Sequence, residues 1–528
     1  MYQMSGRSQL IRLLVVCAIF ALSYSQAWAQ QASPSSETVT VDVRATKAAF
    51  PHFWEEMFGS GRAILTLRDS YRSDLRQVKG ITGFEYVRFH DILDDDVGVY
   101  SEDATGKAVY NFSYVDQIYD GLLSAGVKPF VELSFTPRKL SLDPPTLHPF
   151  WYRPIVSPPR DFDRWEELVY QFGRHLVDRY GINEVASWYF EVWNEPNIDF
   201  WAGNPKEETY YELYDHAARA IKRVSPRLRV GGPASAQAAW VDRFIRHCTE
   251  KNVAVDFVST HVYANDTAQD VFGTKENIPR NQMVCRAARK VHDQVKNSTR
   301  PDLPIIWSEY NASYKNEVAV TDSAFMGPWL ADTIRQCDGM VEMMSYWTFS
   351  DVFDEQGPIQ QPFYGGFGII SAGGVPKPAF NAFRLLHRLG AQRISVESGS
   401  ALATTRKDGS LAIALWNPVS PGESGPDKHV TLKITGLTGK RRIMVWQIDE
   451  TRGSFWPTYE KMGKPRYPTE EQYRQLRGAS AMPPAAPREW NDGVVKLTLP
   501  AHALALVEIE PTGASQTSDH APRNTQDQ

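Results

Sequence analysis

The sequence has little cysteine. Its 528 residues contain four, and one of them, Cys17, lies in the N-terminal apolar stretch. The other three, Cys248, Cys285 and Cys337, allow at most one intramolecular disulfide, and their spacing does not say which two would form it. A small fold held together by several disulfides is therefore excluded, and a chain of this length is expected to fold around a large core.

Long apolar runs and an excess of positive charge are also missing. Outside the N-terminal stretch no apolar run approaches the ~20 residues that cross a bilayer. The formal net charge is −5, which argues against nucleic acid or an anionic membrane as a partner. No His-x-His pair follows the first expected strand, so a metal-dependent barrel hydrolase is not favoured, and no metal or other cofactor is expected.

The first 29 residues have the layout of a secretory signal. Arg7 and Arg12 form a charged start, Leu13–Leu22 an apolar centre, and Ala27–Ala29 a small-x-small cleavage site. A short membrane anchor is the alternative, and it is disfavoured because the apolar run is too short to span a bilayer. We predict cleavage after Ala29 and a secreted or periplasmic chain that has no membrane contact once the signal is removed.

Between residues 51 and 390, short apolar runs alternate with segments of helical period. The runs are nearly all apolar, as expected for parallel strands that are covered on both faces. Eight strands and eight helices in alternation predict an α/β fold, the (β/α)₈ TIM barrel. The expected strands are Phe53–Phe58, Phe84–Phe89, Lys128–Leu133, Ser187–Trp193, Arg227–Val230, Val255–Thr260, Pro304–Ser308 and Val341–Trp347. The expected helices are Asp69–Lys79, Tyr114–Ala125, Asp161–Tyr180, Glu207–Val224, Ala238–Lys251, Gln282–Lys296, Asp322–Asp338 and Pro378–Leu389.

A different pattern begins after residue 390. Short β-rich runs separated by Gly, Pro, Asp or Asn predict an accessory all-β sandwich over residues 391–512. Residues 30–50 contain one alternating run, Thr38–Val43, and are expected to join this sandwich. Residues Met462–Asn491 are rich in Pro, Arg and Gln and are predicted to form a long irregular insertion, and residues 513–528 to be a disordered tail.

Two apolar strands end in a glutamate. The run Trp188–Asn197 delivers Glu195 to the end of the fourth strand, and Leu303–Asn311 delivers Glu309 to the end of the seventh. The carboxyl ends of barrel strands carry active sites, and a pair of carboxyl groups about 5 Å apart is the machinery of a retaining glycosidase. The alternatives are a helix N-terminal acid or solvated loop charge for Glu195 and a structural ion pair for Glu309.

Five motifs in order resemble glycoside hydrolase family 39, the clan A family of β-xylosidases and α-L-iduronidases, over roughly residues 38–510. They are Tyr86–His90, Pro129–Pro137, Phe190–Asn197, Ser308–Tyr314 and Tyr346–Phe353. The resemblance implies that Glu195 is the acid/base and Glu309 the nucleophile, with retained configuration and no metal. It also implies sugar contacts from His90, Asn194, His261, Tyr263, Trp347 and Glu355.

Each binding residue also has a structural interpretation. His90 and His261 could be ordinary buried histidines, Tyr263 could orient Glu309 or simply pack, and Trp347 could belong to the core. Two further candidates are Phe135, which follows the third strand, and Asp354, which with Glu355 could instead form a solvated acidic pair. The chain departs from the family pattern at Asp354, where glutamate is usual, and at Asp91, where glycine is more typical.

The expected partner is an oligosaccharide or glycoside, most simply a terminal β-xyloside, and a homo-oligomer is left open. No Lys or Arg occurs in the segment His261–Asp266, which argues against a uronate in the cleaved position and so against an α-L-iduronide. Glucosides, arabinosides and exopolysaccharides stay open. A carbohydrate-binding protein without catalysis is disfavoured because both glutamates are present.

Overall fold

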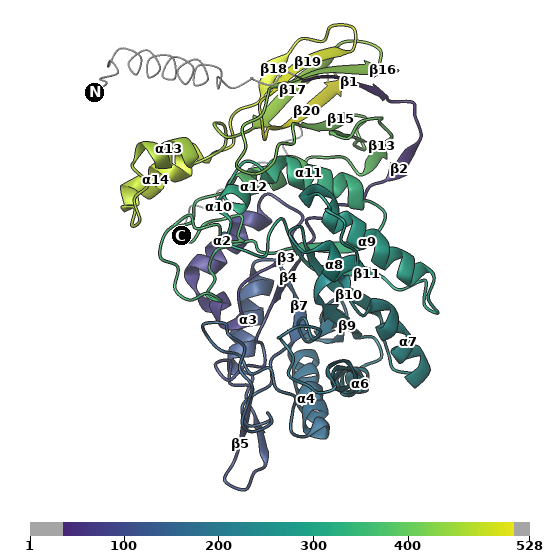
Figure 1. Cartoon of the computed structure of the whole chain (residues 1–528), viewed down its shortest axis with the longest axis vertical. Coiled ribbons are helices and arrows are strands. Elements are labelled where there is room, and N and C mark those ends of the chain that lie inside the picture. The colour runs from purple at the N-terminus through teal and green to yellow at the C-terminus, as the bar shows by residue number, and fades with distance from the viewer. Residues whose placement is uncertain (1–34, 512–528) are drawn as a thin grey trace, which may run out of the picture.

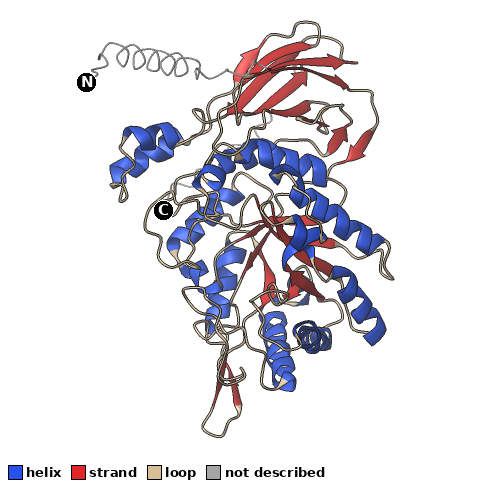
Figure 2. Cartoon of the chain, viewed as in Figure 1, coloured by secondary structure: helices blue, strands red, loops and turns tan. Residues whose placement is uncertain are grey.

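The computed structural model describes residues 35–511, so the expected signal peptide and C-terminal tail lie outside the described residues. A barrel ringed by helices forms one end of the molecule, and a β-sandwich lies at the other end (Figures 1 and 2). Between residues 35 and 511 no helix combines the length and the apolar character that crossing a membrane requires. The predicted TIM barrel with an accessory sandwich is confirmed.

Eight parallel strands close the barrel in chain order. They are β3 (Met57–Gly59), β4 (Tyr86–Phe89), β7 (Lys128–Leu133), β8 (Tyr189–Val192), β9 (Arg229–Ser235), β10 (Phe257–Tyr263), β11 (Ile305–Asn311) and β12 (Met343–Tyr346). The helices around them are α2 (Asp69–Lys79), α3 (Ser113–Ser124), α4 (Phe162–Tyr180), α6 (Lys206–Val224), α7 (Val241–Lys251), α9 (Arg280–Lys296), α11 (Met326–Cys337) and α12 (Pro378–Leu386).

Short elements decorate the barrel loops. The hairpin of β5 (Tyr100–Glu102) and β6 (Ala108–Tyr110) projects from the barrel end farthest from the sandwich (Figure 1). The other short elements are η1 (Ala63–Leu67), α5 (Ile182–Val185), η2 (Ala236–Ala238), α8 (Ala268–Phe272) and α10 (Val318–Thr321).

The barrel interior changes from apolar to polar along the strands. Its lower layer is a cluster made of residues near the strand starts: Met57, Tyr86, Phe130, Phe257, Ile306 and Met343, with Tyr189 packed against them. Since side chains on one face of a strand recur every two residues, the next layer holds the residues two positions on. These include Arg88, Glu132, Glu191, Ser259, Ser308 and Ser345, all buried. The barrel interior therefore has an apolar layer near the starts of the strands and a polar layer nearer their carboxyl ends.

The sandwich consists of two sheets around their own apolar core. One sheet has the order β1-β16-β19, with strands β1 (Ser35–Asp42), β16 (Lys428–Thr435) and β19 (Val494–Leu499). The other has the order β18-β17-β20-β15-β14-β13-β2, with strands β18 (Ala486–Arg488), β17 (Arg441–Ile448), β20 (Leu504–Pro511), β15 (Leu411–Trp416), β14 (Ala401–Thr405), β13 (Gln392–Ile394) and β2 (Lys47–Ala49). The described part of the chain thus begins in the sandwich, where β1 pairs in parallel with β16, and then enters the barrel.

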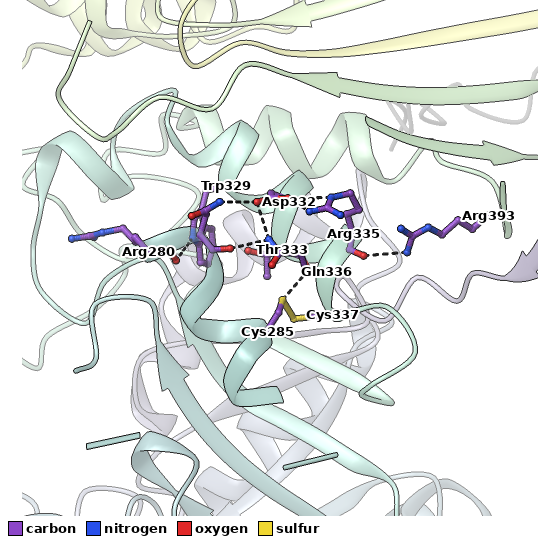
Figure 3. The surroundings of a disulfide bond; sticks show 10 residues. Arg280, Cys285, Trp329, Asp332, Thr333, Arg335, Gln336, Cys337 and Arg393 are labelled. Atoms are coloured by element: carbon purple, nitrogen blue, oxygen red, sulfur yellow. Dashed lines mark hydrogen bonds and ion pairs between the residues drawn. A yellow bond between two sulfur atoms is a disulfide. The ribbon is translucent and has the colours of Figure 1, made fainter. Parts of the chain in front are cut away.

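A disulfide ties together two helices on the sandwich side of the barrel. It joins Cys285 of α9 to Cys337 of α11, and Cys248 is the free, buried cysteine among the described residues. Helix α11 also contacts β15 and β20 of the sandwich. Beside the disulfide, Arg393 of β13 donates to the carbonyl of Arg335 near the end of α11 (Figure 3). The disulfide therefore links α9 covalently to α11, the helix that contacts the sandwich.

The prediction of an irregular insertion at Met462–Asn491 is wrong. This region contains α14 (Glu470–Ala479) and follows α13 (Trp456–Lys461). Helix α14 begins with a capping box in which Thr469 and Gln472 each bond the other's backbone N–H. The signal Thr-x-x-Gln was readable in the sequence, but the surrounding Pro and Arg residues concealed it.

Candidate active site

A cavity of about 370 Å³ opens at the carboxyl ends of the barrel strands. Seven of the ten predicted site residues line it: His90, Asn194, Glu195, Tyr263, Glu309, Trp347 and Glu355. The other three, Phe135, His261 and Asp354, do not form part of its wall. The cavity is further lined by the aromatic residues Phe150, Phe200 and Tyr314 and by the half-buried Asp266.

Arg88 organises the floor of this cavity. Its guanidinium is fully buried and pairs with Glu191 at 2.5 Å, Glu132 at 2.7 Å and Glu309 at 2.7 Å. It also donates to Asn194 Oδ1 at 2.9 Å. This bond orients the amide of Asn194, whose N–H groups can donate to a sugar hydroxyl.

The surroundings of Glu309 suit a carboxylate. Arg88 Nη1 donates to Oε1 at 2.7 Å, and the Tyr263 hydroxyl donates to Oε2 at 2.6 Å. Hydrogen bonds to the charged form of an acid favour that form. Glu309 is 4% exposed, so its two oxygens are held by protein donors with little contact with bulk water.

Glu195 has the opposite environment. Burial, followed by the negative charges of Glu309 and Asp266, holds the pKa of Glu195 well above the usual range of a carboxylic acid. Its backbone has φ 44°, and that of Trp193 has φ 73°, so the chain turns sharply after β8 and carries Glu195 to the mouth. The two glutamates are close: a carboxylate oxygen of each lies within 4.8 Å of the other.

His261 supports Glu195 from below the cavity. Its side chain is completely buried, with Nδ1 3.1 Å from Glu195 Oε1 and Nε2 3.1 Å from Ser308 Oγ. Burial, with the charge of Arg88 second, lowers the pKa of His261 well below its usual value, so the imidazole is neutral near neutral pH. His261 therefore contacts Glu195 from behind the cavity wall.

Phe135 and Asp354 also lie behind the wall. Phe135 is fully buried and stacks parallel to Phe200, with the ring centroids 6.1 Å apart. The carboxylate of Asp354 accepts from Arg62 at 3.3 Å, and Arg62 is also paired with Asp96. Asp354 therefore closes the loop after β12 through an ion pair, while its neighbour Glu355 faces the cavity.

His90 and Trp347 form one side of the cavity. His90 Nδ1 lies 2.8 Å from Glu132 Oε2, which leaves Nε2 toward Glu355 Oε1 at 3.8 Å. The rings of His90 and Trp347 have their centroids 4.9 Å apart. Trp347 requires a glycine at position 59, because a Cβ there would lie 2.3 Å from its ring.

Comparison with known proteins assigns the family. The family model described as "Glycosyl hydrolases family 39" matches residues 37–496. The chain belongs to glycosyl hydrolase family 39. It is 37% identical over 478 residues to a β-xylosidase of Geobacillus stearothermophilus, covering 87% of this chain and 93% of that protein. A β-xylosidase of Caldicellulosiruptor saccharolyticus is 35% identical over 84% of this chain and 91% of its own length.

A solved structure agrees with this assignment. The monomeric β-xylosidase from Caulobacter crescentus CB15 superposes with a TM-score of 0.82 at 33% identity, covering 90% of this chain and 100% of that one. As a family 39 member the chain is a glycoside hydrolase, and a glycoside is its substrate.

Among the residues of this family 39 site that the sequence analysis did not predict are Arg88, Asn197 and Asp266. Arg88 is a single charged residue inside the apolar strand Tyr86–Phe89, a signal that could have been read. Asn197 bonds both the N–H and the carbonyl of Ala236 and so fixes the loop after β9 at the cavity rim. Asp266 accepts from the backbone N–H of Tyr263 at 2.7 Å. Nothing in the sequence indicated these last two contacts.

Proposed function

We propose that the protein is a retaining β-xylosidase in which Glu195 is the acid/base and Glu309 the nucleophile. The observation that carries this proposal is the short separation of the two carboxyl groups, within 4.8 Å between oxygens. Retaining glycosidases need carboxyl groups about 5–5.5 Å apart, whereas inverting enzymes leave about 6.5–9.5 Å for a water molecule.

The two environments support these roles. A raised pKa keeps a proton on Glu195 for delivery to the leaving group. Arg88 and Tyr263 donate hydrogen bonds to the two carboxylate oxygens of Glu309, which suits this group to the role of nucleophile. The pair therefore divides the labour between an acid and a carboxylate, the pattern expected when environment separates two chemically identical groups.

The reaction proceeds in two displacements. In the first, a carboxylate oxygen of Glu309 forms a bond to the anomeric carbon while the bond from that carbon to the leaving oxygen breaks and receives the proton of Glu195. In the second, the Glu195 carboxylate takes a proton from water, and the water oxygen replaces Glu309 at the same carbon. The sugar leaves with its original configuration, and Glu195 is protonated again.

A neutral sugar fits the cavity best. Its described lining includes Glu195, Glu309, Asp266 and Glu355 but no Lys or Arg, so a uronate in the cleaved position would lack a cationic partner. The similarity to the two β-xylosidases named above extends over 93% and 91% of their length, which favours xylose among the neutral sugars.

Azide rescue tests the nucleophile. Glu309→Ala is expected to abolish turnover of an aryl β-xyloside, and added azide should restore it as a glycosyl azide of inverted configuration, identified by NMR. Glu250→Ala, the same substitution at an exposed glutamate of α7, is the matched control and should keep full activity. A folded Glu309→Ala protein that azide does not rescue would argue against the assignment.

A panel of aryl glycosides tests the sugar. Xyloside, glucoside, arabinoside and iduronide are compared by kcat/KM on the wild-type protein. The proposal expects the β-xyloside to be preferred. A glucoside or arabinoside preference would keep the two-step mechanism and replace the substrate.

We also infer export from the cell. The N-terminal 29 residues have the layout of a signal, and the Cys285–Cys337 disulfide suits an oxidising compartment. Mass spectrometry of the protein recovered from the periplasm or medium should give a chain that begins at Gln30. A full-length chain retained in the cytoplasm with both thiols reduced would contradict export.

A further inference from the structure

A second cavity adjoins the catalytic one. Its volume is about 320 Å³, and Gln356, the residue after Glu355, lines both cavities. Phe353, which packs edge to face with Trp347 at 6.1 Å, is also part of its wall. A ligand that fills the catalytic cavity can therefore continue past Gln356 into this second space.

The second cavity carries the opposite charge from the first. Its described lining includes one cation, Arg466, and no carboxyl group. The other polar side chains of the wall are amides and a phenol: Asn316, Gln356, Gln360, Gln361 and Tyr364. Such groups bind hydroxyls without discriminating charge, whereas a guanidinium selects an anion. A carboxylate is thus disfavoured in the catalytic cavity and favoured in its neighbour.

Arg466 belongs to the segment 455–480, which contains α13 and α14 and packs against the barrel. The Trp456 indole donates to the carbonyl of Asp322 at 2.6 Å. The rings of Phe455 and Phe363 stack with their centroids 3.7 Å apart. The segment 455–480 therefore forms a fixed wall beside the loop after β12.

The guanidinium of Arg466 is oriented and keeps donors to spare. Its Nε donates to the Gln360 carbonyl at 3.2 Å, and its Nη2 to Gln360 Oε1 at 2.6 Å. A guanidinium has five N–H groups, and Gln360 takes two of them. Arg466 is exposed, so the remaining donors are accessible to a ligand.

We propose that this second cavity is a leaving-group subsite for an acidic oligosaccharide, in which Arg466 binds the carboxylate of a uronic acid carried by the sugar next to the cleaved xylose. The inference rests on the proposed β-xylosidase function and adds to it a substrate class. A neutral sugar is expected at the cleaved position because the catalytic cavity is lined by carboxyl groups. A uronic acid is expected on the neighbouring sugar because the adjoining cavity is lined by Arg466.

Three substrates and two variants test this subsite. The substrates are an aryl β-xyloside, a neutral xylo-oligosaccharide, and the same oligosaccharide with a glucuronic acid on its leaving-group sugar. The variants are Arg466→Met and the matched control Lys464→Met. Lys464 lies in the same loop and loses the same charge, but it pairs with Glu460 at 2.9 Å and does not line the cavity.

Arg466→Met is expected to lower the ratio of kcat/KM for the acidic oligosaccharide to that for the neutral one by about tenfold, the loss of one charge-assisted contact. Lys464→Met should leave this ratio at the wild-type value. An equal loss on both oligosaccharides, or an equal loss in Lys464→Met, would overturn the acid subsite. Failure of the proposed function would be distinguishable, because the wild type would then not hydrolyse the aryl xyloside.

Discussion

Two buried cations hold the upper part of the barrel together, and their surroundings differ. Arg88 and Lys377 both have completely buried side chains. Arg88 pairs with three carboxylates, Glu132, Glu191 and Glu309, and bonds an amide as well. Lys377 pairs with two carboxylates, at 2.7 Å and 2.6 Å, and donates to a backbone carbonyl.

The two clusters differ in the number of acidic groups near the cation that it does not bind. Beyond the three carboxylates bound by Arg88, Glu195 and Glu355 line the same cavity, and burial with neighbouring charge raises the pKa of both. The partners of Lys377, Asp322 and Asp351, each accept a backbone N–H in addition and lie in the core. The cluster around Arg88 is therefore open, with acidic groups left at the surface of the cavity, whereas the cluster around Lys377 is closed within the core.

Lys377→Met tests the closed cluster and has the largest expected effect. Removing one partner of a buried ion pair leaves the other charges uncompensated, which costs about 3–5 kcal/mol of unfolding free energy. Denaturant unfolding measures the loss, while kcat of the folded fraction should change little. Lys222→Met, which removes a part-exposed pair with Asp256, should cost less than about 1 kcal/mol. Equal stability losses in the two variants would erase the distinction.

Arg88→Lys tests the open cluster. Lysine keeps the charge but cannot supply donors in a rigid fork to Glu309 and Asn194 at once. We expect kcat/KM on an aryl β-xyloside to fall about 10²–10³-fold, as when a preorganised donor is removed, with a smaller stability loss than in Lys377→Met. The control is Arg229→Lys at the start of β9, the opposite end of the barrel. Wild-type activity in Arg88→Lys would make Arg88 structural, like Lys377.

Asp91 has a buried carboxyl group, with no hydrogen-bond partner for either side-chain oxygen among the described residues. Its backbone φ is 72°, a conformation that favours glycine, and glycine is the residue expected there from the family pattern. Asp91→Gly should therefore raise the free energy of unfolding by about 1–3 kcal/mol, the penalty of a buried unpaired polar group. Asn252→Gly at φ 54° is the control, because an exposed Asn tolerates this conformation and should gain little. A destabilised Asp91→Gly would show that the carboxyl group is used.

The fold could be predicted because its strands are apolar runs with little ambiguity, and the two glutamates because each ends such a run. The contacts between strands could not. His261 of β10 contacts Glu195 of the loop after β8, and the register of β10 against β11 shifts just before His261, which no local pattern specifies. Similarly, the position of Arg88 in an apolar strand indicates a buried charge, but its carboxylate partners come from three other strands.

Asp266→Asn tests how a neighbouring negative charge raises the pKa of Glu195, and it has the smallest expected effect. The charge of Asp266 helps to raise the pKa of Glu195, after burial and Glu309. Asp266 has a pKa of about 6, raised chiefly by burial, so it is ionised on the alkaline side of the activity profile. Activity requires protonated Glu195 and is lost as pH rises through its pKa. Removing the Asp266 charge lowers that pKa, so the alkaline limb of kcat/KM should move to lower pH, by less than about one unit.

Asp302→Asn, at an exposed site before β11, should leave the limb in place. A limb that stays fixed in Asp266→Asn would mean that burial and Glu309 alone keep the proton on Glu195.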